Sequence, residues 1–145
     1  MCVGLAALAA TSCGHTIVDT PTKFRDDGWV LTIRKVTDGP NAYREMNTAY
    51  TPVNGQRLIW VHVTLRNLKT VPRKFNFDRC DLDAGDKVYV PTLIDADDIG
   101  GNLVAREPEL GVNEYIDRRL IFAYPRDRSP TRLSCTPMVM PLPQF

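Results

Sequence analysis

The chain has almost no net charge and contains no long apolar run. It has 18 Lys and Arg against 17 Asp and Glu, which leaves a net charge of +1 over 145 residues. A balance this close produces no long-range field that would recruit a nucleic acid, so we expect no nucleic-acid partner. No apolar stretch approaches the roughly 20 residues that a membrane-spanning helix needs. The length suits a single domain, and we therefore expect one domain without a spanning helix.

Long helices are not expected either, because 11 Pro and nine Gly interrupt the chain throughout. Instead, residues 28–36, 57–67 and 113–124 alternate apolar and polar side chains, which is the period of a half-buried β-strand. In the middle segment an apolar stripe runs from Ile59 to Leu65, so this segment is predicted to be a central strand. Frequent turn residues favour a β-sandwich over a sheet covered by helices.

Shorter features complete the predicted sandwich. A hairpin is expected at 82–89 around a Gly-Asp turn, and a last short strand is expected to end near Cys135. Residues 41–55 lack a clear period and predict a loop. Residues 95–111 predict a long connection between the two sheets, in which Leu103 and its neighbour pair briefly.

The amino-terminal segment has the pattern of an export signal. Residues 1–10 are apolar and small, as in the central region of a secretory signal, and residues 10–14 read Ala-Thr-Ser-Cys-Gly. This pattern resembles a bacterial lipobox, which implies that Cys13 carries a lipid and becomes the mature first residue. We predict a lipoprotein-type signal segment over 1–13 and a flexible tether over 14–27. The alternatives are a signal that is removed entirely and a first buried segment.

A lipidated Cys13 places the protein in the cell envelope, anchored to the membrane on its extracytoplasmic side. Each buried methylene contributes about 0.8 kcal/mol, so a doubly acylated Cys holds a domain at a membrane without a spanning helix. The expected contact with the membrane is the lipid anchor alone.

Three features then follow in a characteristic order along the chain. A long apolar strand ends in Asn67, a hairpin carries the Gly-Asp turn at 82–89, and a strand led by Gly111 closes with an aromatic residue before Pro125. This order resembles that of the immunoglobulin-like domains of bacterial surface lipoproteins, which include an uncharacterised lipoprotein family and the secreted mycobacterial immunoprotective antigens. The resemblance implies an all-β, immunoglobulin-like antiparallel β-sandwich of about seven strands over 28–145. It implies no catalytic residues.

Two cysteines remain once Cys2 and Cys13 are assigned to the signal segment. Cys80 and Cys135 form an even pair in a chain that is predicted to be exported, which favours a disulfide between them. Closing a loop of about 55 residues would stabilise the protein by roughly 4 kcal/mol in the simple chain model. The alternative is two buried reduced thiols. No Cys-x-x-Cys spacing is present, which argues against zinc or thioredoxin chemistry.

His62 is the one histidine that could serve a catalytic site, because His15 falls in the expected tether. A general base at this position needs a nucleophile and an orienting carboxylate. The serines of the mature chain, Ser129 and Ser134, lie near its end and lack an elbow motif. We therefore interpret His62 as a partly exposed strand histidine and predict that the protein is not an enzyme.

Two acidic clusters could bind calcium, which prefers six or more converging oxygen ligands. They consist of Asp81, Asp83 and Asp86, and of Asp95, Asp97 and Asp98. Neither has the alternating acids, central Gly and closing Glu of an EF-hand loop, and turn capping explains the first cluster equally well. We predict no metal and no cofactor, and keep calcium binding as the alternative.

Arginines and tryptophans provide two further candidate contacts. The basic concentration consists of Arg118, Arg119, Arg126, Arg128 and Arg132. It can be an anion-binding patch, but the interspersed Asp residues favour a solvated, ion-paired face. Trp29 and Trp60 can form an aromatic platform for sugar or lipid, but large aromatics more often anchor a core.

The sequence thus predicts a non-enzymatic exported lipoprotein whose β-sandwich acts as an envelope interaction or structural module. The expected partners are the membrane, through the lipid anchor, and an envelope protein. The long connections at 37–55 and 95–111 are the expected contact surfaces, because loops carry binding in such scaffolds. The alternative is a small-ligand or calcium-binding extracytoplasmic protein, and a third hypothesis is a hydrolase that uses His62.

Overall fold

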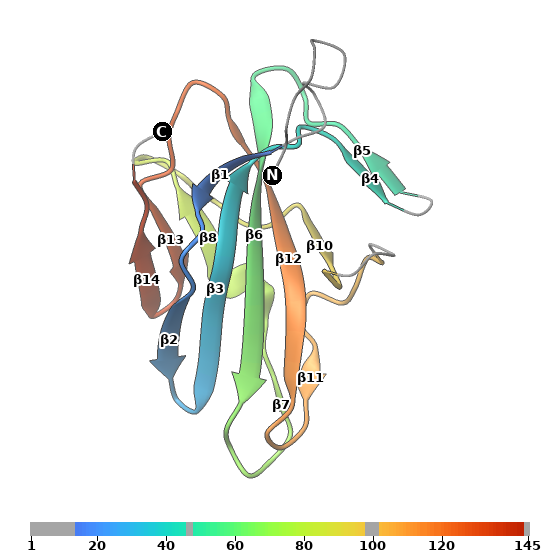
Figure 1. Ribbon diagram of the computed structural model, residues 1–145, viewed down its shortest axis with the longest axis vertical. Helices are drawn as coiled ribbons and strands as arrows, with labels where there is room; N and C mark the ends of the chain where they lie inside the picture. The colour runs from blue at the N-terminus through green and yellow to red at the C-terminus, as the bar shows by residue number, and fades with distance from the viewer. Residues whose placement is uncertain (1–13, 46–47, 98–101, 144–145) are drawn as a thin grey trace.

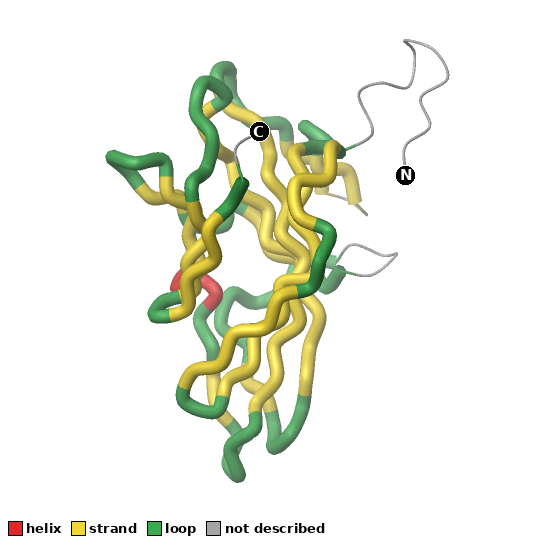
Figure 2. Tube along the Cα trace, turned by 60° about the vertical axis from the view of Figure 1, so that its left-hand side comes forward, coloured by secondary structure: helices red, strands yellow, loops and turns green. Residues whose placement is uncertain are grey.

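The computed structural model describes residues 14–45, 48–97 and 102–143, and within these ranges the protein is built almost entirely of antiparallel strands. Figure 2 shows two layers of strands that face each other, with a single helical turn between strands. The all-β sandwich predicted from the sequence is confirmed, although it contains more and shorter strands than the seven expected. No helix in the described ranges has the length and apolar character needed to cross a membrane.

The larger layer is a six-stranded sheet in the order β1-β3-β6-β12-β10, and β2 pairs with the same edge of β3 as β1 does (Figure 1). Its strands are β1 (His15–Val18), β2 (Thr22–Asp26), β3 (Trp29–Asp38), β6 (Gln56–Asn67), β10 (Leu93–Asp95) and β12 (Tyr115–Pro125). The prediction that residues 57–67 form a central strand is confirmed, because β6 pairs with β3 on one side and with β12 on the other.

The smaller layer is a four-stranded sheet in the order β14-β13-β8-β9. Its strands are β8 (Cys80–Asp83), β9 (Val88–Tyr89), β13 (Arg132–Cys135) and β14 (Met138–Pro141). The predicted hairpin at 82–89 is present as β8 and β9, whereas β14 was not predicted. Two small two-stranded sheets are separate from both of these sheets, formed by β4 (Tyr43–Glu45) with β5 (Thr48–Tyr50) and by β7 (Arg73–Lys74) with β11 (Glu109–Leu110). The helical turn is η1 (Phe77–Arg79).

The main core lies between the two layers. From β6, the stripe of Ile59, Val61, Val63 and Leu65 points into it with no exposed surface. The opposite layer contributes Leu82, Leu133 and the two cysteines, and Phe75 and Phe77 fill the space between. Trp29 packs edge-on against Phe75 with ring centroids 5.3 Å apart. Trp29 is therefore a core anchor, as predicted.

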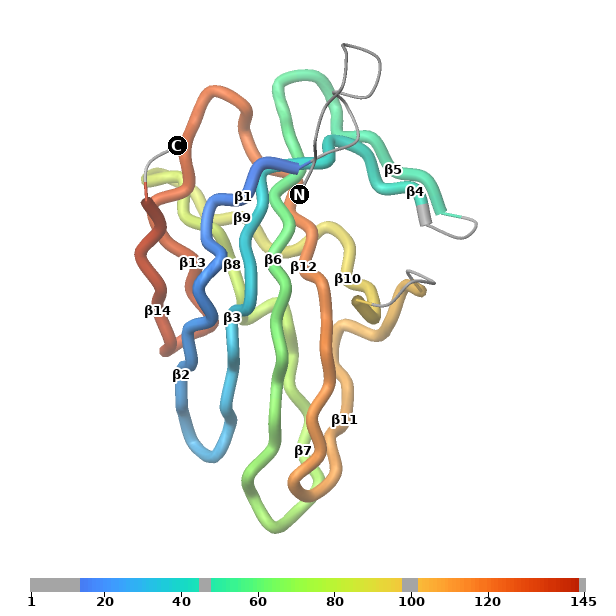
Figure 3. Tube along the Cα trace, in the orientation of Figure 1, coloured from blue at the N-terminus to red at the C-terminus, as the bar shows by residue number. Residues whose placement is uncertain are grey.

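The predicted flexible tether at 14–27 is wrong for most of its length, because β1 and β2 occupy it and both pair with β3 (Figure 3). Apolar side chains explain why this segment forms strands. Ile17, Val18 and Phe24 pack against the core, while Lys23 and Arg25 stay exposed. A short apolar stripe of this kind gains enough burial to hold an edge strand.

Two predicted connections also contain strands. The loop expected at 41–55 includes the β4–β5 hairpin, which projects from the main sheet (Figure 3). The connection expected at 95–111 includes a bridge between Asp95 and Leu103 and ends in β11. The brief pairing predicted for Leu103 is thus confirmed.

A disulfide joins Cys80 on β8 to Cys135 on β13, in agreement with the prediction. The two residues stand directly opposite each other in the ladder between these strands. Both are buried, so the bond connects two strands of the smaller layer across 55 residues of sequence.

Replacing both cysteines, Cys80→Ala with Cys135→Ala, should lower the free energy of unfolding by about 4 kcal/mol, because the unfolded chain regains the entropy of the open loop. Urea unfolding followed by tryptophan fluorescence measures this difference. The wild-type protein, unfolded in the presence of a thiol reductant, should approach the stability of the double variant. Equal stability of the double variant and of the wild type without reductant would show that the bond contributes nothing.

Candidate functional site

The outer face of the main sheet, which points away from the smaller layer, carries the chemistry-bearing side chains. Burial of the apolar stripe of β6 sends the alternate residues of that strand to the outer face, since successive side chains of a strand point in opposite directions. These are Leu58, Trp60, His62, Thr64 and Arg66. The sequence predicted this division correctly.

The β4–β5 hairpin covers one end of the outer face. A second apolar cluster forms there from Tyr43, Leu58, Trp60, Ile121 and Ala123. The rings of Tyr43 and Trp60 stack with centroids 5.8 Å apart, and the indole nitrogen of Trp60 donates to the Pro40 carbonyl over 2.8 Å. Trp60 therefore anchors a small core of its own and also forms one wall of the adjoining site.

A β-bulge in β3 brings two consecutive side chains to the outer face. Ile33 pairs with Val63 and Lys35 pairs with His62, so Arg34 is one residue in excess of the β6 ladder. Val36 then returns to the core. Bulges re-aim side chains in this way and are frequent next to functional sites. Here the bulge places both Arg34 and Lys35 beside His62.

One row of charged residues crosses four strands of the sheet as a consequence. Lys35 on β3 is opposite His62 on β6, His62 is opposite Arg119 on β12, and Arg119 is opposite Asp95 on β10. Neighbouring strands lie about 4.8 Å apart, so the ammonium of Lys35 and the guanidinium of Arg119 flank the His62 imidazole. The segment around β10 supplies carboxylates to this row.

Asp95 neutralises Arg119. Its side chain is fully buried, and Arg119 donates to both carboxylate oxygens, over 2.8 Å from Nε and 2.5 Å from the terminal nitrogen. The hydroxyl of Tyr43 donates to Oδ2 of Asp95 over 2.8 Å. Burial of an ion pair is tolerated where further hydrogen bonds satisfy the carboxylate, and Asp95 meets that condition.

Asp97 contacts His62 and Arg34. Nδ1 of His62 lies 3.3 Å from each of its carboxylate oxygens, and the guanidinium of Arg34 forms a close ion pair with it. The backbone N–H of Asp97 donates to Oδ1 of Asp95 over 3.0 Å, which fixes the turn after β10. Burial by itself would raise the pKa of Asp97, but hydrogen bonds from His62 and Arg34 outweigh it and lower the pKa to about 2.

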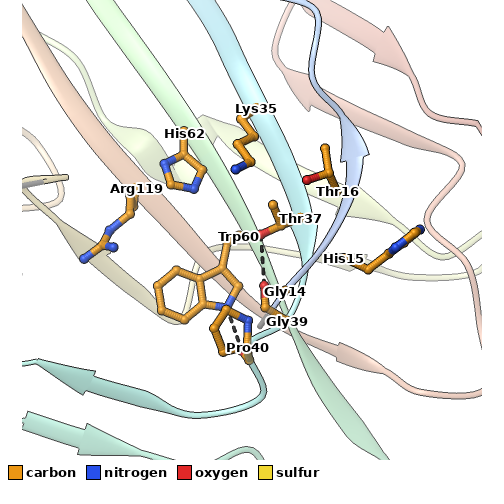
Figure 4. A pocket seen from close by; sticks show the side chains of 10 residues that line it. All are labelled: Gly14, His15, Thr16, Lys35, Thr37, Gly39, Pro40, Trp60, His62 and Arg119. Carbon is orange, nitrogen blue, oxygen red and sulfur yellow. Dashed lines mark hydrogen bonds between the residues drawn. The ribbon is translucent and has the colours of Figure 1, made fainter. Parts of the chain in front are cut away.

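A hollow of about 520 Å³ opens over this row (Figure 4). Its lining comprises Gly14, His15, Thr16, Lys35, Thr37, Gly39, Pro40, Trp60, His62 and Arg119. The lining includes the cations Lys35 and Arg119 and the imidazole of His62, and no carboxylate. Within the described part of the chain, Lys35 makes no hydrogen bond or ion pair, since the carboxylates bind Arg34, His62 and Arg119 instead.

The chain enters the sheet at the rim of this hollow. A Cβ added to Gly14 would overlap the Gly39 carbonyl oxygen, so only glycine allows the close approach of these two segments. β1 begins at the next residue, His15. Residue 14 is therefore packed against the body of the domain.

A second hollow, of about 340 Å³, lies further along the outer face. Its lining includes Lys23, Arg25 and Arg66, together with the exposed ring of Tyr115. Arg66 donates to the side chain of Asn113 over 3.1 Å. In the ranges that the structure describes, none of these three cations has a carboxylate partner.

The acidic residues considered for calcium are largely bound to arginines. Asp83 pairs with Arg132 over 2.6 Å and accepts from the backbone N–H of Gly85, and Asp86 pairs with Arg128. The backbone hydrogen bond from Gly85, followed by Arg132, lowers the pKa of Asp83 despite a contribution from burial. The described residues contain no group of three His, Cys, Asp or Glu side chains that could bind a metal ion. Asp98 lies outside the described residues.

The five arginines do not form one patch. Arg118 and Arg119 point to opposite faces of β12, and Arg126 donates to the Gln56 carbonyl over 3.2 Å. Arg128 and Arg132 bind acids near the smaller layer. The favoured interpretation was a solvated, ion-paired face, and acids from elsewhere in the chain pair with Arg119, Arg128 and Arg132. The predicted lipidation site Cys13 lies outside the described residues.

Comparison with known proteins finds similarity in fold. No family model matches the chain, and no curated protein matches its sequence. A conserved hypothetical protein from Bacillus anthracis is 14% identical with a TM-score of 0.64, over 88% of this chain and 95% of that one. An uncharacterized β-sandwich protein from Clostridium difficile is 14% identical with a TM-score of 0.54, over 84% and 85%.

A third similar structure is described as a putative lipoprotein from Bacillus subtilis. It is 16% identical with a TM-score of 0.51, over 75% of this chain and 31% of that one. At such identities the likeness shows the β-sandwich fold alone. This chain is thus similar in fold to uncharacterised bacterial β-sandwich proteins.

Sequence reasoning missed the partners of His62 and the position of Lys35. The bulge had one visible signal, the two consecutive polar residues between Ile33 and Val36 in an otherwise alternating strand. Contact between His62 and Asp97 had none, because it depends on a connection that leaves β10 after pairing with β12.

The free energy of unfolding should fall as the pH is lowered, and protonation of Asp97 should cause part of this fall. Its pKa in the folded protein, about 2, lies below the ordinary value of 3.8 for an aspartate, so its stabilising effect is complete above about pH 4 and is lost as the pH falls toward 2. The loss should be about 2 kcal/mol. Urea unfolding at a series of pH values from about 5 to about 2 should show this fall in the wild type. The fall should be smaller in Asp97→Asn.

Asp127→Asn is the matched control, because it removes a carboxylate from the exposed loop after β12. This variant should keep the wild-type fall in stability. Parallel profiles for the wild type and Asp97→Asn would mean that Asp97 gains no stabilisation from His62 and Arg34.

Proposed function

We propose that this chain is a non-enzymatic, lipid-anchored module of the bacterial cell envelope, which contacts an envelope partner through the outer face of its main sheet. The observation that carries the proposal is the set of cations on that face without carboxylate partners in the described residues, Lys23, Arg25, Lys35 and Arg66. Uncompensated charge on one face favours association with a partner of complementary charge. This surface takes the place of the connections at 37–55 and 95–111 as the main expected contact.

The anchor is supported by two observations of different kinds. The residues before Cys13 resemble a lipobox, and a putative lipoprotein from Bacillus subtilis shares the fold. Kinship with bacterial surface lipoproteins, including the secreted mycobacterial immunoprotective antigens, is part of the same proposal. Localisation to the extracytoplasmic side of the membrane follows from the anchor.

The absence of catalysis is proposed from the surroundings of His62. Its pair with Asp97 resembles the base and orienting acid of a hydrolase, so a nucleophile is the missing part. Among the described residues, Ser134 lies in the smaller layer and both cysteines are joined in the disulfide. The hydroxyl of Thr37, which lines the hollow, donates to the Gly39 carbonyl.

Calcium binding, the earlier alternative, is disfavoured by the pairing of the acids. Arg119 occupies both oxygens of Asp95, and Arg34 and His62 occupy Asp97. A calcium ion would have to displace these side chains from both aspartates and then collect six or more oxygens. A small anion suits the neighbouring unpaired Lys35 better.

The anchor is tested by the mass of the native protein and by its location in the cell. Wild-type protein purified from bacterial membranes should begin at Cys13 and carry acyl chains, whereas Cys13→Ser should lose the added mass and leave the membrane fraction. Cys2→Ser is the matched control, because Cys2 belongs to the signal segment, and it should behave as the wild type. An unmodified Cys13 in the mature protein would refute the anchor.

The partner surface is tested by photo-crosslinking in cells. A photoreactive residue in place of Tyr115, whose side chain is 63% exposed on the outer face, should yield a crosslinked envelope protein. The same residue in place of Val88, which is 53% exposed on the smaller layer, should not. Arg66→Glu should reduce the product at position 115. Equal products from both positions, or none from position 115, would contradict the proposed surface.

A further inference from the structure

We propose that the hollow over Lys35 binds the phosphate of an anionic phospholipid, whose headgroup lacks the balancing cation of phosphatidylcholine, and that this contact seats the domain on the membrane that holds its anchor. The inference rests on the proposed anchor at Cys13 and adds a ligand site to it. The chemistry shared by all candidate ligands is a phosphate ester, and the lipid is the source that the position of the site favours.

Charge is the first step of the argument. Lys35, His62 and Arg119 line the hollow, and the two carboxylates that balance this row are not part of its lining. Asp95 makes two contacts to the Arg119 guanidinium and Asp97 makes two to the His62 imidazole, so Arg119 and His62 are fixed in orientation. Lys35 remains without a partner in the described residues. A phosphate suits such a site, since charge-assisted hydrogen bonds are stronger than neutral ones.

Size and lining are the second step. A volume of about 520 Å³ falls within the range of small-molecule sites, which is about 300 to 1,000 Å³. Besides the cations, the wall carries the threonine hydroxyls of Thr16 and Thr37 and the ring of Trp60 (Figure 4). The hollow therefore has space for a lipid headgroup that consists of a phosphate and an attached polyol.

Position is the third step, and it selects the lipid. Gly14 lines the hollow and is packed against Gly39, and β1 begins at His15. Adjacent Cα atoms are about 3.8 Å apart, so acyl chains on Cys13 would begin within one residue of the rim. A bilayer has a polar layer several ångströms thick on each side of its roughly 30 Å apolar core. The hollow would then lie at the depth of the headgroups.

The second hollow provides an internal comparison. Lys23, Arg25 and Arg66 also lack carboxylate partners in the described residues, but they lie near the other end of β3, beside Val30. Val30 is opposite Arg66 and Lys35 is opposite His62, so the two positions lie about four residue steps apart along β6, or roughly 13 Å. A contact that depends on the anchor should use Lys35 and should not need Lys23.

The experiment compares the lipidated mature protein, from Cys13 onward, in nanodiscs of phosphatidylcholine alone and of phosphatidylcholine with phosphatidylglycerol. Hydrogen–deuterium exchange of the peptides that contain β1 and the end of β3 is the readout. Exchange in these peptides should slow by about tenfold when phosphatidylglycerol is present, which is the size expected for a charged hydrogen bond. Lys35→Glu should abolish the slowing, and Lys23→Glu should retain it.

A second variant and a soluble ligand complete the design. Lys35→Met keeps an unbranched apolar side chain but removes the ammonium group, so it should also lose the slowing. Equal urea midpoints would show that both variants fold. Inorganic phosphate and glycerophosphoglycerol, added to the phosphatidylcholine discs, should protect the peptides less than the anionic membrane does.

The outcomes separate the two proposals. Protein that enters both discs but exchanges identically in them would overturn the lipid site and leave the anchor intact. Protection that survives Lys35→Glu, or that free phosphate ester reproduces in full, would overturn the lipid site as well. Protein that enters neither disc would overturn the anchor and, with it, the seat on the membrane.

Discussion

The pairing of β6 with both β3 and β12 determines the rest of this structure. Four apolar side chains of β6 reach the main core with no exposed surface, and this burial fixes the register of the strand. A shift by one residue would send the whole stripe to the other face. Because the inner face is fixed, the outer face is fixed too, and His62 necessarily stands between a residue of β3 and a residue of β12.

The bulge in β3 then decides what stands beside His62. In an uninterrupted ladder Arg34 would face His62, and Lys35 would point into the apolar core. The extra residue instead leaves Val36 in the core and both cations outside. Burying an unpaired ammonium group would be far more costly than disrupting one ladder step. The same bulge therefore keeps an apolar residue in the core and places both cations on the outer face.

Much of this architecture could be predicted from the chain alone. Alternation in 57–67 was enough to identify the central strand and its two faces, because a fully buried stripe leaves a clear period. The same rule applied to 14–27 would have found Phe24 between two polar residues. Pro21 and Thr22 obscured it by discouraging regular structure, but Pro21 lies between β1 and β2, where no ladder hydrogen bond is required of it.

The acidic segment after β10 shows where prediction from sequence ends. Asp95 suggested a polar connection, yet it is fully buried, because Arg119 lies directly opposite and Tyr43 reaches it from the β4–β5 hairpin. Its environment is created by residues 24 and 52 positions away. Local pattern cannot reveal such partners, since burial of an acid depends on which cation the fold brings to it.

A net charge of +1 also conceals how the charges are arranged. Asp95, Asp97 and Asp117 on the outer face are bonded to neighbours, while several cations of that face have no acid of their own in the described residues. Interactions between exposed charges are screened beyond about 8 Å at physiological salt, so such a face attracts an anion only at short range. The proposed lipid anchor would remove this limitation, because it holds the domain at the membrane and so replaces diffusion by a high effective concentration. A weak anion site next to a lipid anchor can therefore orient a nearly neutral domain that would not find the membrane by charge.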